Sequence, residues 1–400
     1  MLQNNAPAVK PSKLNMNLIP YFEHDNKGII CKCLKNALFY ANIKGNNIGG
    51  KDMRIFNYSS IKDQKWGSDT LGLIAAIYRY AGKQELYLNQ RPEKLDKLVD
   101  IAMIQSTETS NAIEGIVTTS SRLRQIINEK TTPRDRNEQE IAGYREALSI
   151  IHESFDVIPI TQNYILQLHK IMYSHTNNPM AGRTKSVQNY ISAAYPGGRM
   201  ETLFTPLAPY ETPEALDRIC EEYNRVIGNM EVEPLIAIPV FIHDFLCIHP
   251  FNDGNGRMSR LLTTLLLYRN GFYVGRYISL EAKIAQTKDL YYDALAKAQT
   301  GWHDGEEDAT PFINYLLGTI LAAYKDFEER FELIEAKLPA HEMVRRATLK
   351  KIGRFNKQDI RELCPTLSDS SIEGALRKLV DSGELKREGN GKNTCYFRLN

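Results

Sequence analysis

The chain lacks several features by which broad classes of protein are recognised. No apolar run in its 400 residues approaches the ~20 residues that a membrane-spanning helix needs. The opening residues, MLQNNAPAVKPSK, contain no apolar core of a secretion signal, so we expect a cytoplasmic protein with no membrane association. The 50 Lys and Arg residues nearly balance the 48 Asp and Glu residues, and a net charge of +2 does not indicate nucleic-acid or membrane binding by the chain as a whole.

Cysteine is also scarce, and its spacing predicts neither a disulfide framework nor a zinc site. Only two of the six cysteines are close in sequence, and no second pair completes a tetrahedral metal site. We therefore expect free thiols in a reducing compartment for Cys31, Cys33, Cys220, Cys247, Cys364 and Cys395.

Helical periodicity dominates the middle of the chain and predicts a mainly α fold. Apolar residues recur at helical spacing from about Trp66 to about Leu338, whereas the stretch between Gly182 and Pro213 carries Tyr, Val, Ile and a Pro-Gly-Gly turn typical of a hairpin or irregular loop. We divide the chain into an N-terminal extension of unclear fold (1–65), an N-terminal helical region (66–135), a helical core (136–338) and a small C-terminal domain (342–400).

The C-terminal domain resembles a winged helix. A short helix, a Pro-containing turn and a second helix from Ser370 to Ser382 precede two strand-like runs around the turn GNGKN. Its 13 Lys and Arg residues exceed its 8 Asp and Glu residues by five, which suits DNA binding but equally allows a protein-interaction or dimerisation module. The expected DNA contacts are Arg377, Lys378, Lys386 and Arg387.

The stretch IHPFNDGNGRMSR, Ile248 to Arg260, predicts an anion site. The residues after DGNG have helical periodicity, so the glycines lie just before a helix N-terminus, where unpaired N–H groups and the helix dipole attract anions. Gly254 and Gly256 permit positive φ and close backbone approach. Arg257 and Arg260 are three residues apart, so we expect both to face the same anion.

The same stretch contains an acid–base group and a carboxylate. Pro250 disfavours helix at His249, which leaves that imidazole at a helix exit as a candidate general base. Phosphates would repel Asp253 unless a bridging Mg²⁺ joined them. His243 is an alternative metal ligand, but it falls on a strongly apolar helix and reads as a packed core residue. The set is typical of a nucleotidyl or phosphoryl transferase.

HPFNDGNGRMSR matches the HxFx(D/E)GNGRxxR signature of Fic-domain proteins at every defined position. This resemblance implies a helical Fic-type core with a β-hairpin flap, and transfer of AMP from Mg²⁺-bound ATP to a protein hydroxyl. It makes His249 the base, Phe251 a core anchor and Asp253 the Mg²⁺ ligand. Related kinases carry Lys where this chain has Gly256, which favours AMP transfer. The resemblance assigns the α- and β-phosphates to Gly254, Asn255 and Gly256, and the β/γ end to Arg257 and Arg260.

The segment SNAIEG, Ser110 to Gly115, resembles the inhibitory motif [S/T]xxxE[G/N] of the same family. Glu114 is expected in the last turn of a helix, where an anion opposes the macrodipole by ~0.3–1 kcal/mol. The resemblance implies that Arg260 compensates it through a salt bridge and that Ser110 and Glu114 inhibit the enzyme.

Other assignments rest on weaker matches. The resemblance assigns adenosine contacts to Tyr291, Tyr292 and Gln299, although Asn is expected at the last position and the tyrosines are equally consistent with helix packing. VQNYIS, with Tyr190 and Ile191, is the candidate flap that pairs with a target backbone.

Two other readings stay open, namely a DNA-binding regulator that uses the Fic domain as a nucleotide sensor, and a Fic enzyme that uses another nucleotide or removes AMP. Expected partners are a target protein and a second copy of the chain.

Overall fold

The computed structural model describes residues 54–90, 95–194, 200–335, 338–351, 353–364, 366–391 and 394–399. Most of the N-terminal extension, with Cys31 and Cys33, and the Pro-Gly-Gly turn at 196–198 lie outside these ranges. No helix in the described ranges combines the length and apolar character needed to cross a bilayer.

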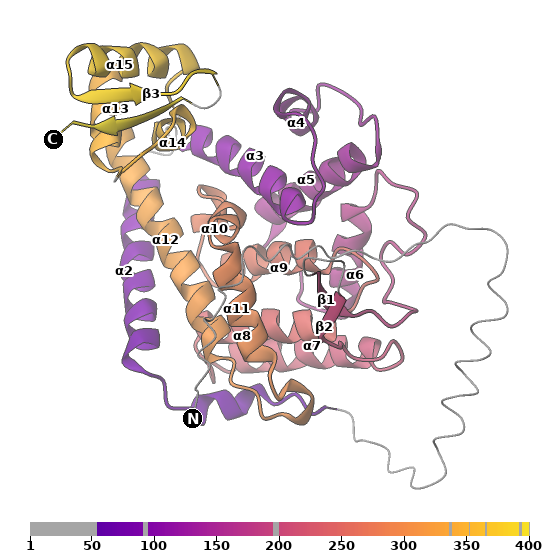
Figure 1. The fold of residues 1–400 in the computed structure, drawn as a ribbon. Coiled ribbons are helices and arrows are strands. Elements are labelled where there is room, and N and C mark those ends of the chain that lie inside the picture. Colours follow the sequence, from indigo (N-terminus) through magenta and orange to yellow (C-terminus); the bar gives the residue numbers. More distant parts are fainter. Residues whose placement is uncertain are drawn as a thin grey trace, which may run out of the picture.

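Helices make up most of the described chain, as the periodicity between about Trp66 and about Leu338 predicted (Figure 1). Short 3-10 turns η1 (Tyr58–Asp63), η3 (Val274–Arg276) and η4 (Trp302–Asp304) join them. The helices of the main body are α2 (Ser68–Gln90), α3 (Asp96–Ile113), α4 (Ser120–Ile127), α5 (Arg136–Ser154), α6 (Gln162–Met172), α7 (Thr212–Gly228), α8 (Pro234–Ile248), α9 (Asn255–Arg269), α10 (Leu280–Gln286), α11 (Lys288–Gln299) and α12 (Thr310–Glu335).

Helices α8 and α9 form the centre of the main core. Nearly every residue of both is buried, and α8 packs on α7, α9, α11 and α12. A helix that is apolar on all sides must be covered on all sides, which explains why PLIAIPVFIHDFLCI occupies the middle of the body. The loop between α8 and α9 carries the signature residues, so the core holds both ends of that loop.

Helix α3 lies across the body beside α5 and α10, and its C-terminal end reaches α9 (Figure 1). It ends at Ile113, and Gly115 follows with φ of +80°. Glycine adopts this left-handed conformation without steric cost, so it stops the helix. This packing brings SNAIEG to the start of α9.

A hairpin forms in the region expected to contain one. Strands β1 (Ile191–Ala194) and β2 (Met200–Phe204) are antiparallel, with Ile191 opposite Phe204 and an irregularity between Ile191 and Ser192. The predicted flap residue Ile191 therefore begins β1, and Tyr190, which is 58% exposed, immediately precedes it. We refer to this hairpin as the flap.

The C-terminal residues form a second core. Helices α13 (Ala340–Leu349), α14 (Lys357–Leu363) and α15 (Asp369–Asp381) precede antiparallel strands β3 (Leu385–Glu388) and β4 (Cys395–Arg398). A capping box between Asn356 and Asp359 begins α14. Leu333, near the end of α12, belongs to this second core, so α12 connects both parts.

Candidate functional site

The signature loop begins where α8 stops. His249 has φ of +53°, a left-handed conformation that is uncommon for a residue with a side chain. The Asn255 side chain then closes the loop, because its Oδ1 accepts from the Phe251 N–H at 2.9 Å and its Nδ2 donates to the Phe251 carbonyl at 2.7 Å. The phosphate-binding role predicted for Asn255 is thus accompanied by a loop-closing role that its buried amide performs.

The two glycines of the loop allow close approach. Gly254 is the N-cap of α9 with φ of +84°, and a Cβ there would collide with Met172 and Tyr173. A Cβ on Gly256 would collide with the Glu114 carboxylate. The backbone at the helix N-terminus therefore faces an anion in this structure, and that anion is Glu114 itself.

The His249 ring is neutral and keeps one nitrogen unprotonated. Its Nδ1 lies 3.2 Å from the Leu246 carbonyl, which can only accept, so Nδ1 carries the proton and Nε2 keeps a lone pair. Burial above all, and the charge of Lys185 next, lowers the pKa of His249 to about 4. The imidazole is therefore neutral at pH 7, further from its ordinary pKa than sequence reasoning assumed.

Arg260 is held by the end of α3. Its Nε donates to Ser110 Oγ at 2.8 Å, and its Nη2 donates to the Ser110 carbonyl at 2.9 Å and to Glu114 Oε1 at 2.8 Å. Burial is the largest single influence and lowers the pKa of Arg260, but the charge and hydrogen bond of Glu114, together with Tyr144 and Tyr291, outweigh it, so the pKa is raised. The structure thus places Ser110 and Glu114 on the arginine that the resemblance assigned to them.

Arg257 departs from the expectation that both arginines face one anion. Its side chain is fully buried, forms an ion pair with Glu140 at 2.8 Å, and donates to Tyr173 Oη at 2.6 Å. It also lies 3.4 Å from Asn111 Oδ1 on α3. The carboxylate of Glu140 on α5 and the phenol of Tyr173, which follows the end of α6, hold the Arg257 guanidinium in this structure.

Asp253 has the environment of a Mg²⁺ ligand that shares the ion with phosphates. Its Oδ1 accepts from the Gly254 N–H at 2.7 Å, while Oδ2 lies 3.8 Å from Arg136 Nη2 and 41% of the side chain is exposed. Within the described ranges no group of three or more His, Cys, Asp or Glu side chains could hold a metal. One accessible carboxylate beside the glycine-rich N-terminus of α9 fits Mg²⁺, which is usually held by one or two carboxylates plus substrate phosphates.

The residues predicted to contact adenosine divide into two groups. Tyr291 and Tyr292 pack edge to face at 5.2 Å, and Arg260 and Glu114 influence the pKa of both phenols, which burial raises. Gln299 instead lies beside the Cys247 thiol of α8 in the core and is 8% exposed. The structure therefore brings the tyrosines toward the Glu114–Arg260 pair and places Gln299 beside Cys247 instead. His243 is buried, as expected for a core histidine.

Sequence reasoning missed His169 on α6. Its ring stacks on Phe251 at 3.7 Å, its Nδ1 accepts from the Gly182 N–H at 2.9 Å, and its Nε2 lies 3.1 Å from the Asp253 carbonyl. The bond from Gly182 fixes the proton on Nε2, so His169 donates to the signature loop. Burial, the largest cause, lowers the pKa of His169 to about 4, which keeps this arrangement at neutral pH. Its position among the apolar residues of α6 gave no signal of this contact.

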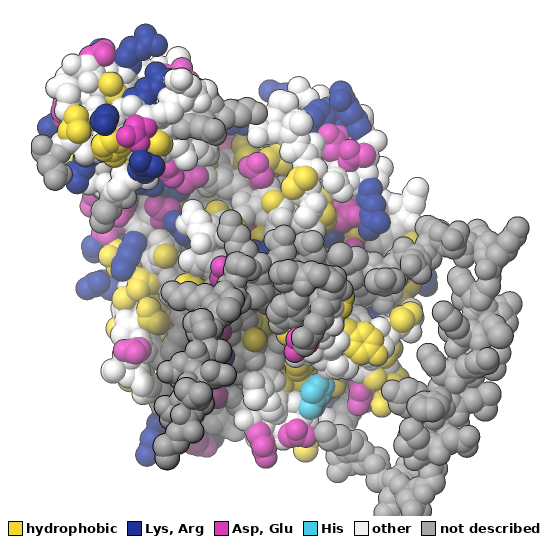
Figure 2. All heavy atoms as spheres, in the orientation of Figure 1, with side chains coloured by type: hydrophobic (Ala, Val, Ile, Leu, Met, Phe, Trp, Pro, Cys, Tyr) yellow, Lys and Arg dark blue, Asp and Glu magenta, His cyan; other side chains and the backbone are white. Residues whose placement is uncertain are grey.

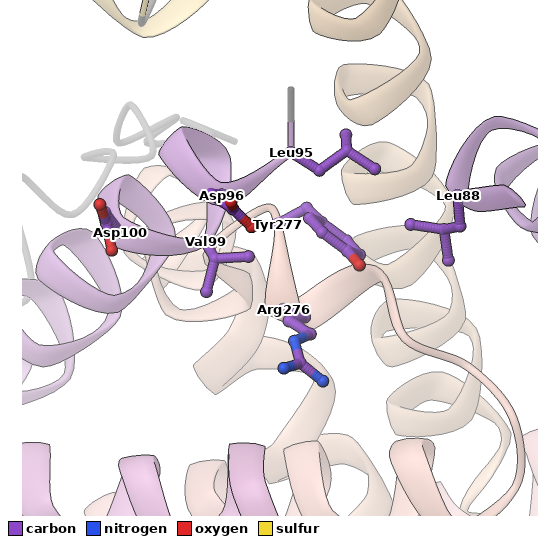
Figure 3. Close-up of a pocket in the computed structure, with 7 residues that line it drawn as sticks. All are labelled: Leu88, Leu95, Asp96, Val99, Asp100, Arg276 and Tyr277. Atoms are coloured by element: carbon purple, nitrogen blue, oxygen red, sulfur yellow. The ribbon is translucent and has the colours of Figure 1, made fainter. Parts of the chain in front are cut away.

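A separate pocket of about 420 Å³ lies between α2, α3 and η3, away from the signature loop (Figure 3). Tyr277 and Arg276 project into it from η3 and its end, opposite Leu88 of α2. No signature residue lines the pocket, so we place the site at the loop, where the chemistry of the side chains converges, rather than in this cavity.

Comparison with known structures agrees with this fold. The solved Fic family protein from Desulfovibrio desulfuricans G20 superposes with a TM-score of 0.54 at 21% identity, covering 84% of this chain and 97% of that one. C. elegans Fic-1 (residues 134–508) gives 0.51 at 21% identity, covering 68% and 74%. At such identities the likeness shows the fold alone, and the fold is the helical Fic fold.

Sequence comparison finds similarity over part of the chain. Residues 159–267 match the model of the Fic/DOC family. It is 28% identical over 252 residues to "Protein adenylyltransferase Fic" of Nematostella vectensis, covering 57% of this chain and 52% of that protein. It is 29% identical over 186 residues to "Protein adenylyltransferase fic-1" of Caenorhabditis elegans, covering 45% and 32%. The chain thus matches about half or less of the length of these relatives.

Proposed function

We propose that this protein is an adenylyltransferase that moves AMP from ATP to a Ser, Thr or Tyr hydroxyl of a protein, itself included. The observation that supports this most is the neutral His249 imidazole, held in a left-handed turn directly before a glycine-rich helix N-terminus. Nucleotide binding alone has no use for a base. Relatives that match at 28–29% identity are named protein adenylyltransferases.

The proposed reaction follows from the positions of these groups. His249 Nε2 takes the proton of the target hydroxyl as its oxygen attacks the α-phosphorus of ATP. The new bond joins that oxygen to the α-phosphorus, the bond from the α-phosphorus to the bridging oxygen breaks, and pyrophosphate leaves. The N–H groups at the start of α9 hold the phosphates. Mg²⁺, when bound at Asp253, would neutralise phosphate charge.

The proposal includes autoinhibition. Glu114 already occupies the space against Gly256 and holds Arg260, so a triphosphate that reaches the N-terminus of α9 meets a carboxylate in place of a free guanidinium. Because the pair is largely buried, solvent screens this repulsion only weakly. ATP bound in this state has its α-phosphate misaligned for in-line attack.

The flap supplies the proposed contact with the target. β1 and β2 pair only with each other in the described part of the chain, which leaves an outer strand edge for a target segment. Ile191 lies on β1 and Tyr190 just before it, so these residues are proposed to face the strand that carries the modified hydroxyl.

Incubation of the protein and its Glu114→Gly variant with Mg²⁺ and ATP labelled at the α-phosphate tests the function. Label should appear on protein from α-labelled ATP and be absent with γ-labelled ATP, which distinguishes AMP transfer from phosphate transfer. No label on protein even from Glu114→Gly would refute the proposal and favour the nucleotide-sensor reading. The same experiment with other labelled nucleoside triphosphates tests the nucleotide preference.

We also propose that the C-terminal part is a winged helix that binds duplex DNA. The residues predicted to contact DNA are all exposed, with Arg377 and Lys378 on α15 and Lys386 and Arg387 on β3. Figure 2 shows basic side chains gathered on this part of the molecule, with a few acidic ones between them. Two other basic residues nearby form close ion pairs, Arg345 with Glu384 and Lys357 with Glu373. Within the predicted set, Lys386 lies 3.8 Å from Glu388.

A further inference from the structure

The buried Lys185 and the half-buried Asn189 form hydrogen bonds with the backbone on both sides of His249. Lys185 is 2% exposed, and its Nζ donates to the Ile248 carbonyl at 2.9 Å and to Asn189 Oδ1 at 3.0 Å. The Lys185 N–H donates to the Pro250 carbonyl at 2.7 Å. Asn189 Nδ2 completes the set by donating to the Phe251 carbonyl at 3.0 Å. Bonds from one short segment thus reach the carbonyls immediately before and after the histidine.

This segment leads directly into the flap. Asn189 is two residues before β1, and Gln188 Nε2 bridges the Asn189 and Pro206 carbonyls at 3.0 Å each, which ties the two arms of the hairpin together. The base and the flap that is proposed to hold the target are therefore joined through one hydrogen-bonded unit.

We propose that Lys185, supported by Asn189, is a positioning residue that holds His249 in its reactive conformation and sets its place relative to the flap. This inference rests on the proposed function of His249 as the base. A left-handed conformation at a non-glycine residue is strained and persists only where its surroundings fix it. The hydrogen bonds of Lys185 and Asn189 provide that constraint.

The location of the ammonium group adds a second reason. Ile248 is the last residue of α8, where helix carbonyls lack intrahelical partners and the dipole favours a cation. Lys185 Nζ satisfies one of these carbonyls from inside the core. Burial lowers the pKa of Lys185 to about 7, with nearby Glu211 opposing the shift, so the amine can donate whether or not it carries its third proton.

Lys185→Met tests the proposal, because methionine keeps the stem and the backbone bond to Pro250 but removes the Nζ donors. In the Glu114→Gly background we expect the rate of self-modification at saturating ATP to fall roughly 10- to 100-fold, since misplacement by about 1 Å can cost 10²-fold. The half-saturating ATP concentration should stay unchanged, because the hydrogen bonds of Lys185 go to Asn189, Ile248 and Pro250 and not to the N-terminus of α9. Lys185→Arg should restore part of the rate, and Lys170→Met, an exposed lysine on α6, should have no effect.

A measurement without transfer keeps this test independent of the proposed function. Diethyl pyrocarbonate modifies neutral imidazoles, and peptide mass spectrometry follows its reaction with His249 in the ATP-free protein. We expect faster labelling of His249 in Lys185→Met than in Lys170→Met at equal thermal stability. Equal labelling of His249 in both variants, or an unchanged rate of self-modification in an active Glu114→Gly background, would overturn the inference. Absence of transfer from Glu114→Gly alone would instead refute the adenylyltransferase assignment, and the labelling comparison would still decide the role of Lys185.

Discussion

Replacement of Glu114 by glycine should activate the protein, and the contacts of Arg260 set the size of the effect. The variant removes the bond from Arg260 Nη2 to Glu114 but keeps the two bonds to Ser110. A hydrogen bond to a charged group contributes about 1.5–3 kcal/mol, which corresponds to roughly 10- to 150-fold in the population of free Arg260. We therefore expect AMP transfer to rise by about that factor.

The same variant should be less stable without nucleotide and gain more from it. Loss of about 1.5–3 kcal/mol lowers the Tm by roughly 2–4 °C in total, because a chain of 400 residues has an unfolding entropy of roughly 0.8 kcal/mol per kelvin. ATP no longer has to displace a carboxylate, so it should raise the Tm of Glu114→Gly by more than that of the wild type at the same concentration.

The assay compares initial rates of self-modification from α-labelled ATP at matched concentrations. Ser110→Ala is the matched control, because it removes one bond to Arg260 but leaves the Glu114 carboxylate, and it should activate much less. Arg260→Ala should not activate, because it frees Glu114 and removes a phosphate ligand together. Wild-type activity equal to that of Glu114→Gly would show that the SNAIEG segment has a structural role and does not inhibit the enzyme.

Three further predictions follow from the site and the C-terminal part. His249→Ala should lower transfer by about 10²–10⁴-fold while the Kd for ATP stays nearly unchanged, and an equal loss of ATP affinity would contradict its role as a base. Because the pKa of His249 is lowered to about 4, its imidazole is neutral across roughly pH 5.5–8. The transfer rate of Glu114→Gly should therefore fall only as the pH drops toward 4. A fall in rate centred on the ordinary histidine pKa of ~6.5 would contradict the proposed burial of the His249 ring. The full chain should bind duplex DNA with a steep salt dependence in fluorescence anisotropy. Combined replacement of four residues by alanine should reduce both the affinity and the salt slope, namely Arg377, Lys378, Lys386 and Arg387. No DNA binding by the wild type at low salt would leave protein recognition as the role of this part.

The helices and the signature loop were predictable from the sequence because both are local. Helical periodicity depends on neighbours within a few residues, and the DGNG segment is contiguous with the helix it begins. The left-handed backbone of His249 was not predicted, although Pro250 correctly indicated that α8 ends before it.

Contacts between distant segments could not be read in the same way. The partner of Arg257 is Glu140, 117 positions earlier on α5, and no spacing rule connects the two. Nothing in the sequence around Lys185 indicated that its Nζ would donate to the Ile248 carbonyl, 63 positions later. The Glu114–Arg260 contact was anticipated only because a family resemblance supplied it.

Helix α12 contributes residues to both hydrophobic cores. The helix has 26 residues, so it is about 39 Å long, and it runs from the main body into the second core (Figure 1). Its first half contributes Tyr315, which packs against Tyr291 at 5.5 Å, while Leu333 near its end is buried with α13–α15. A displacement of the second core at Leu333 would therefore act on the same hydrogen-bonded helix that holds Tyr315 against Tyr291.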